Sequence, residues 1–229
     1  MQSEMGKDKQ MYAVPSCLFA GFLGGDEARQ QVKRRIWSYL IFKLAGKLTD
    51  EAISNALDRL QLSAKDPRAA YREGQKIAEQ LTTRSFYMIS LPDLYKIVDG
   101  EHSEVFVRDW LAYQAIRSIE GKKNFMRITN KLWLARMDGK DRASSLAELS
   151  EEVRAISGRK TMYAMRERLY EHYTVVTYAS AHMYGGYFVS TKLSVKELIE
   201  RLERGWHAKV SKLAKAIAEA EGTIERGTP

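Results

Sequence analysis

Apolar residues recur at helical spacing through most of the chain, and residues that start or stop helices separate the runs. An apolar residue returns every fourth position within residues 32–44, so the sequence predicts a helix that Asp26 caps and Gly46 ends. Two further helices are expected after Thr49 and after Asp66, because both residue types cap helices and a proline follows Asp66. The pattern therefore predicts successive short helices.

Less regular segments flank these helices. The apolar run at residues 12–22 precedes the first helix, residues 85–90 are typical of a short strand, and Pro92 starts another short helix. We interpret residues 1–103 as a helical N-terminal domain, and no motif in it indicates a function.

The second half begins with an amphipathic helix from Ser103 to Gly121. Residues 129–137, with the sequence TNKLWLARM, predict another helix. Ser145 and Glu148 have the spacing of a capping box, so the next helix is expected to begin at Ser145. The pattern in this half is again mainly α.

A basic helix is expected over residues 159–172, and it is followed by a change of pattern. Three apolar residues at spacings of three and four line one side of this helix, which leaves its arginines and lysine toward the other side. Residues 175–179 and 187–191 are β-rich, and the segment between them, SAHMYGG, ends in two glycines that permit a tight turn. The sequence therefore predicts a β-hairpin directly after the basic helix.

The last segment, residues 194–229, opens with a second capping box formed by Ser194 and Glu197. Apolar residues continue at helical spacing to Ala218. This C-terminal helix either folds back on the protein or pairs with a second copy to form a homodimer.

Charge is concentrated in the middle of the chain. The net charge is +8, and residues 104–193 hold 15 Lys and Arg against 10 Asp and Glu. Such an excess fits a polyanionic partner. Cys17 is the only cysteine, no apolar run is long enough for a membrane helix, and the N-terminus lacks the apolar core of a signal peptide. We therefore expect a cytoplasmic protein with no membrane association.

Helix, turn, basic helix and β-hairpin is the order of elements in a winged helix-turn-helix. Residues 104–193 resemble that superfamily, which includes domains of phage regulators and plasmid replication initiators. The segment 129–137 with the winged part also resembles uncharacterised proteins of bacterial mobile elements. The resemblance implies a mainly α fold, with a helical N-terminal domain, a winged domain with a β-hairpin wing and a C-terminal helix. It also implies a non-catalytic protein that binds double-stranded DNA, as a transcriptional regulator or replication initiator of a plasmid or phage.

In a winged helix-turn-helix the basic helix enters the major groove and the hairpin lies beside it. The residues expected near bases are Arg159, Lys160, Tyr163 and Arg166. The residues expected to contact phosphates are Lys122, Lys123, Arg127, Lys131 and Lys192, with Thr129 and Asn130 at a helix N-terminus. His182, at the tip of the hairpin, is expected either to enter a groove or to pack on the domain.

Other interpretations remain open. The basic helix is also compatible with a solvated amphipathic helix in which Arg166 and Arg168 pair with Glu167 and Glu171, although DNA contact is the favoured interpretation. The residues before 129 are compatible with an ordinary capped loop. The rival function is a winged-helix protein–protein interaction module in a phage or plasmid assembly, which an exposed apolar patch near the basic helix would favour.

Enzymatic motifs are weak. The four histidines lack the spacing of a zinc site, and no phosphate-binding GxxxxGK[ST] loop occurs. Asp109, Glu120 and Lys122 superficially resemble the acidic pair and lysine of a metal-dependent nuclease, but Asp109 lies within a predicted helix. We therefore expect no catalysis, no cofactor and no metal.

Overall fold

The computed structural model describes residues 10–81, 83–179 and 186–225, and within the last helix it leaves out the side chains of residue 210 and residues 213–225. Within these ranges the protein is mainly helical, with two small antiparallel sheets. The helices are α1 (Asp26–Ala45), α2 (Asp50–Leu60), α3 (Pro67–Glu79), α4 (Leu91–Asp99), α5 (Glu104–Glu120), α6 (Asn130–Met137), α7 (Glu151–Ala155), α8 (Arg159–Tyr173) and α9 (Val195–Glu225). The strands are β1 (Met11–Pro15), β2 (Phe86–Ser90), β3 (Met126–Ile128), β4 (Val176–Tyr178) and β5 (Tyr187–Ser190). Two short 3₁₀ helices are η1 (Ser16–Phe19) and η2 (Leu146–Glu148).

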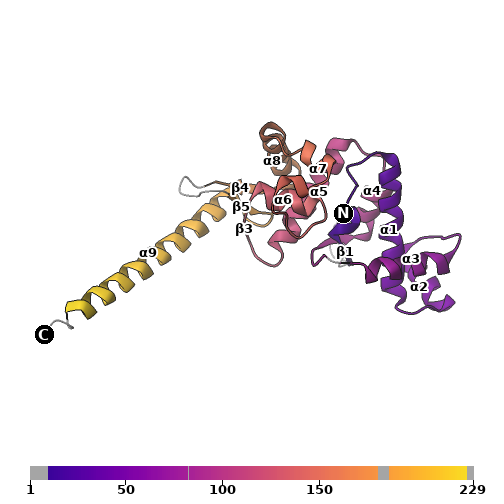
Figure 1. Ribbon diagram of the computed structural model, residues 1–229, viewed down its shortest axis with the longest axis horizontal. Helices are drawn as coiled ribbons and strands as arrows, with labels where there is room; N and C mark the ends of the chain where they lie inside the picture. The colour runs from indigo at the N-terminus through magenta and orange to yellow at the C-terminus, as the bar shows by residue number, and fades with distance from the viewer. Residues whose placement is uncertain (1–9, 82, 180–185, 226–229) are drawn as a thin grey trace, which may run out of the picture.

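Helices α1 and α3 pack closely in the N-terminal part of the molecule (Figure 1). Helix α1 ends at Gly46, whose φ of +68° permits the left-handed turn that closes the helix. The close packing depends on Gly74 of α3, because a Cβ placed there would lie 2.0 Å from the carbonyl oxygen of Ser38 in α1. The backbones of α1 and α3 are therefore in direct contact at Gly74.

The apolar run at residues 12–22 forms β1, the 3₁₀ helix η1 and the turn that follows them. Strand β1 pairs antiparallel with β2, so the strand predicted at residues 85–90 is confirmed. The inward side chains of this two-stranded ribbon are Tyr12, Val14, Tyr87 and Ile89, all nearly inaccessible. The ribbon thus gives the N-terminal part a β component that the sequence pattern only half predicts.

The central part contains α5, α6, α7 and α8, followed by a hairpin. The three-stranded sheet has the order β3-β5-β4, with β5 antiparallel to both neighbours. Helix α6 packs on α5, and Trp133 of α6 is fully buried and donates a hydrogen bond of 3.0 Å to the carbonyl oxygen of Ala112. Because β3 and β4 flank β5, the sheet joins the segment before α6 to the segment after α8.

The prediction that a helix begins at Ser145 was wrong. Ser145 precedes only the 3₁₀ turn η2, and α7 begins instead after Ser150, whose hydroxyl accepts a hydrogen bond from the backbone N–H of Val153. Leu149 separates the two in an extended conformation, with its side chain buried. The carboxylate of Asp138 accepts a 3.0 Å hydrogen bond from the backbone N–H of Ser150 and holds this break in place.

The buried hydrophobic residues before and after residue 103 form one continuous cluster. Phe19 of η1 lies between Tyr87 of β2 and Trp110 of α5, with ring centroids 5.2 Å and 5.5 Å away. The N-terminal helices and the central helices are therefore built around a shared core.

Helix α9 leaves the molecule at the three-stranded sheet and runs away from the rest of the chain (Figure 1). Its first turns are held by Leu198, which packs with Val176 and Leu193 in a second small core. Further along, Trp206 is 59% exposed. In the part of the chain that the structure describes, we find no helix with the length and apolarity to cross a membrane.

Candidate nucleic-acid interface

Five of the residues expected to meet DNA line one open groove of about 840 Å3. Asn130 comes from the first residue of α6, and the others come from the N-terminal half of α8. These four are Arg159, Lys160, Tyr163 and Arg166. The groove thus joins the starts of two helices, whose backbone N–H groups favour an anion. Among the described residues that line the groove, none is acidic.

Arg159 and Lys160 form the first turn of α8 and are exposed. Gly158 stands at the helix cap and has no side chain that could bond the first backbone N–H groups. These two cations and the helix terminus therefore present positive charge on the same side of the groove. The buried residues of α8 are Met162, Met165 and Leu169, as the seam in the sequence predicted.

Tyr163 is 61% exposed in the middle of this surface. A hydrogen bond to Glu167, one turn further along α8, raises the pKa of its phenol. The ring therefore stands on the outer face of the helix as a neutral group at ordinary pH, with a carboxylate beside its hydroxyl.

Arg166 is held more firmly than the other groove cations. Its Nη2 donates a 2.6 Å hydrogen bond to Oδ1 of Asn130, and its guanidinium carbon lies 4.4 Å from the ring centroid of Tyr187 in β5. Burial raises the pKa of Tyr187 to about 12, so the ring beneath the guanidinium stays neutral. Arg166 thus links α6, α8 and the sheet. The alternative in which Arg166 pairs with a glutamate of its own helix is therefore not the arrangement observed.

The basic residues before α6 lie on the turn after α5 and on strand β3, where Lys122, Lys123 and Arg127 are exposed. Lys192 also lies here, but its ammonium donates to the carbonyl oxygens of Gly121 and Lys123 at 2.9 Å and 2.5 Å. Those carbonyls follow the C-terminal end of α5, where a cation is favoured. Lys192 therefore holds the turn that carries the two other lysines.

Thr129 and Lys131 have local structural partners. The hydroxyl of Thr129 caps α6 by accepting a 3.1 Å hydrogen bond from the N–H of Leu132. The ammonium of Lys131 donates a 2.8 Å hydrogen bond to the carbonyl oxygen of Ser144. His182 lies outside the described residues.

The three residues considered for a metal-dependent nuclease are not brought together. Asp109 and Glu120 are eleven residues apart on α5, or about 16 Å along the helix axis. Asp109 pairs with Arg168, and the carboxylate of Glu120 accepts hydrogen bonds from Thr191. Within the described ranges, no three His, Cys, Asp or Glu side chains gather as a metal site would need.

Two residues of this surface were missed from the sequence. Ser157 lines the groove just before α8. Tyr170 is 56% exposed on α8, seven residues after Tyr163 and therefore on the same face of the helix. The spacing of seven residues between Tyr163 and Tyr170 could have indicated from the sequence that Tyr170 lies on the same face.

No protein-family model, no curated protein and no solved structure matches this chain. What the protein does must therefore be inferred from its own residues.

Proposed function

We propose that residues 104–193 form a winged helix-turn-helix and that the protein binds double-stranded DNA without catalysis, as a transcriptional regulator or replication initiator. The order of elements supports this: α5, β3, α6, α7, α8, and then the strands β4 and β5, which pair with each other. In this proposal α8 is the recognition helix, β4 and β5 are the strands of the wing, and the pairing of β3 with β5 ties these strands to the helical core.

The observation that carries the proposal is the groove between α6 and α8. Arg159, Lys160 and Arg166 line it together with the polar groups of Asn130 and Tyr163. Phosphates are bound by such cations and by helix N-termini, while base edges are read by arginine and polar side chains on a helix in the major groove. The bond from Arg166 to Asn130 fixes both side chains before DNA arrives, which reduces the entropy lost on binding.

Three further exposed basic residues precede the groove in sequence. Lys122, Lys123 and Arg127 precede α6 and are exposed, and they would follow the DNA backbone beside the recognition helix. Contacts of this kind set the affinity and its dependence on salt without reading the sequence.

The test is fluorescence anisotropy of a labelled mixed-sequence duplex, titrated with the protein at several salt concentrations. The variant carries Arg159→Ala and Lys160→Ala together, and its matched control carries Arg72→Ala and Lys76→Ala on the exposed face of α3. Both variants lose two positive charges, so they separate a local contact from a change in net charge.

We expect the wild type to bind tightly at low salt and the control to bind equally well. The groove variant should bind about tenfold more weakly or worse. Its plot of log K against log salt should be shallower by about 0.9 for each of the two cations that also neutralises a phosphate. Absence of binding at low salt, or equal losses in the two variants, would contradict the proposal.

A protein–protein interaction module is the second candidate, and one observation favours it. Tyr163 and Tyr170 stand exposed on one face of α8, and tyrosine is enriched in protein interfaces. Replacing Tyr170 by Ala separates the two functions, because it removes aromatic surface without changing the charge of the groove. Unchanged DNA affinity in this variant, together with loss of a captured protein partner, would favour the second candidate.

A further inference from the structure

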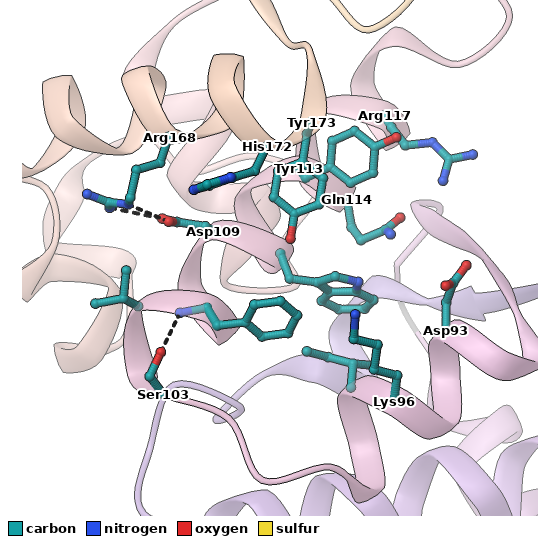
Figure 2. Close-up of a pocket in the computed structure, with 14 residues that line it drawn as sticks. Asp93, Lys96, Ser103, Asp109, Tyr113, Gln114, Arg117, Arg168, His172 and Tyr173 are labelled. Atoms are coloured by element: carbon teal, nitrogen blue, oxygen red, sulfur yellow. Dashed lines mark hydrogen bonds and ion pairs between the residues drawn. The ribbon is translucent and has the colours of Figure 1, made fainter.

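A second cavity lies on the other side of α8, between that helix, α4 and α5 (Figure 2). Its volume of about 570 Å3 falls within the range of about 300–1,000 Å3 that is usual for small-molecule sites. It is lined by residues of the N-terminal and central parts of the chain, and it shares no lining residue with the groove proposed for DNA.

Aromatic rings form much of the lining. Trp110 is 7% exposed, and Phe106 lies one turn before it on α5. Tyr113 of α5 stacks on Tyr173 of α8, with ring centroids 4.6 Å apart and an interplanar angle of 24°. Each of these two tyrosine rings covers a face of the other, so the cavity presents aromatic edges as well as faces, against which a planar aromatic ligand can pack edge-to-face.

Cations stand over two of these rings. The ammonium of Lys96 lies 5.5 Å from the ring centroid of Phe106, and the guanidinium carbon of Arg117 lies 5.6 Å from that of Tyr113. Figure 2 shows Lys96 and Arg117 on different sides of the cavity. Each of these contacts is weak, because water screens a cation–π contact at a solvated site, so both cations retain the capacity to bind an anion.

The charges of Arg168 and Asp109 neutralise each other. Arg168 donates to both carboxylate oxygens of Asp109 at 2.5 Å and 3.0 Å, so this pair contributes little net charge to the cavity. Asp93, at the rim, accepts a 2.6 Å hydrogen bond from the hydroxyl of Ser90. Asp93 keeps its negative charge, since a serine hydroxyl is a neutral donor, but Lys96 and Arg117 outnumber it and the remaining charge of the cavity is positive.

Gln114 supplies an unmet hydrogen-bond acceptor. Its side chain lines the cavity and is 4% exposed, and its Oε1 has no hydrogen-bond partner among the described residues. A buried acceptor without a donor is unfavourable, because it has lost its hydrogen bonds to water without replacing them. Rotation about the last torsion of glutamine, which is soft, lets this oxygen accept a hydrogen bond from a ligand.

We propose that this cavity binds a small molecule in which a planar ring carries an anionic group. The ring would pack against Trp110 and the edge of Tyr113, because Tyr173 stacks on the Tyr113 ring and Arg117 also contacts it. The anion would bind Arg117 or Lys96. A cationic ligand is disfavoured because the faces of Phe106 and Tyr113 already hold cations. The proposal does not depend on DNA binding, because the groove residues are not part of the cavity.

Isothermal titration calorimetry of the full chain without DNA tests the proposal with matched pairs of probes. Indole-3-acetate and its neutral amide form one pair, and adenosine monophosphate and adenosine form the other. The first pair tests a carboxylate and the second a phosphate, so the two sources of the anionic group are distinguished.

We expect at least one of the anions to bind with a dissociation constant below about 1 mM and at least about tenfold more tightly than its neutral counterpart. Arg117→Gln or Lys96→Gln should remove this preference, whereas Arg72→Gln, on the exposed face of α3, should leave it intact. Circular dichroism of each variant checks that its fold is retained.

Three results would overturn the proposal. One is that neither anion binds below about 1 mM, which is the weak end of specific affinity. Another is that each anion and its neutral counterpart bind equally, since the cations would then have no role. The third is that both cavity variants bind the anion as well as the wild type does, because the ligand would then lie elsewhere.

Discussion

Two aspartate–arginine pairs with two hydrogen bonds each differ strongly in burial at the residue scale, and the more buried aspartate also has Arg108 at 3.7 Å. Asp109 and Arg168 form two hydrogen bonds, of 2.5 Å and 3.0 Å, and the side chain of Asp109 is 6% exposed. Asp50 and Arg68 also form two, of 2.7 Å and 2.8 Å, but the side chain of Asp50 is 74% exposed. Water screens the exposed pair and leaves the buried pair unscreened.

We therefore expect Asp109→Asn to lower the free energy of unfolding by about 2 kcal/mol, because it leaves Arg168 without its carboxylate. Asp50→Asn should cause no measurable change. Urea denaturation at neutral pH, followed by circular dichroism, measures both variants. Equal effects of the two substitutions would show that burial does not strengthen the Asp109 pair.

The exposure of the groove residues of α8 could be predicted from the sequence, but the contacts that these residues make with other elements could not. Arg159, Lys160 and Tyr163 lie outside the apolar seam of α8, so helical spacing alone places them toward solvent. Arg166 lies on the same side, yet its partners are Asn130 and Tyr187, 36 and 21 residues away in sequence. Contacts of that range depend on the sheet and on the packing of α6, which local spacing does not encode.

The elements depend on one another through close backbone contacts, and Gly74 is the clearest case. It is buried where α3 crosses α1, and an added Cβ would meet backbone atoms of Ser38 at 2.0 Å and 2.6 Å. Gly205, in α9, has nothing within 4 Å of the same position.

Gly74→Ala should therefore destabilise the protein by about 2 kcal/mol or more, because overpacking outweighs the gain of about 1 kcal/mol in helix propensity. Gly205→Ala supplies the same gain without a clash, so it should not lower the melting temperature. Thermal unfolding by circular dichroism compares the two. A melting temperature for Gly74→Ala equal to that of the wild type would refute the close packing of α1 and α3.

Helix starts were predictable at four places where a single side chain decides them. Thr49, Asp66, Ser103 and Thr129 each accept a hydrogen bond from the N–H three residues further on, as their residue types indicated. The cap expected at Asp26 was wrong, because Asp26 is the first residue of α1 and Gly25, which has no side chain, is its N-cap. The start at Ser145 was wrong, because Asp138 binds the backbone N–H of Ser150 and places the break there. A cap that depends on a residue twelve positions away is a tertiary contact, so the local pattern could not show it.

Helix α9 matters at the scale of the whole molecule because it runs away from the body (Figure 1) and its sequence carries an apolar stripe. Ile199, Leu202 and Trp206 continue in sequence at spacings of three and four to Ile217, and the side chain of Trp206 is 59% exposed. A second copy offers the same stripe, so two α9 helices can cover each other around a two-fold axis. We propose that the chain is a homodimer through this helix.

Light scattering after size exclusion should then give about twice the chain mass of 26.2 kDa. Trp206→Lys, which places a charge in the stripe, should give the mass of one chain. Ala208→Lys places the same charge on the opposite face of α9 and should leave the dimer intact. A wild type that elutes with the mass of one chain at high concentration would contradict the dimer.

Helix α8 contributes to both cavities of the central part. Arg159, Tyr163 and Arg166 line the groove, while Arg168, His172 and Tyr173 line the cavity against α4 and α5. A shift of this one helix on binding at either end would displace residues at the other, which would couple the two equilibria. Thermodynamic linkage then fixes the size of the effect in both directions: whatever factor a small molecule applies to the affinity for DNA, DNA applies to the affinity for that molecule.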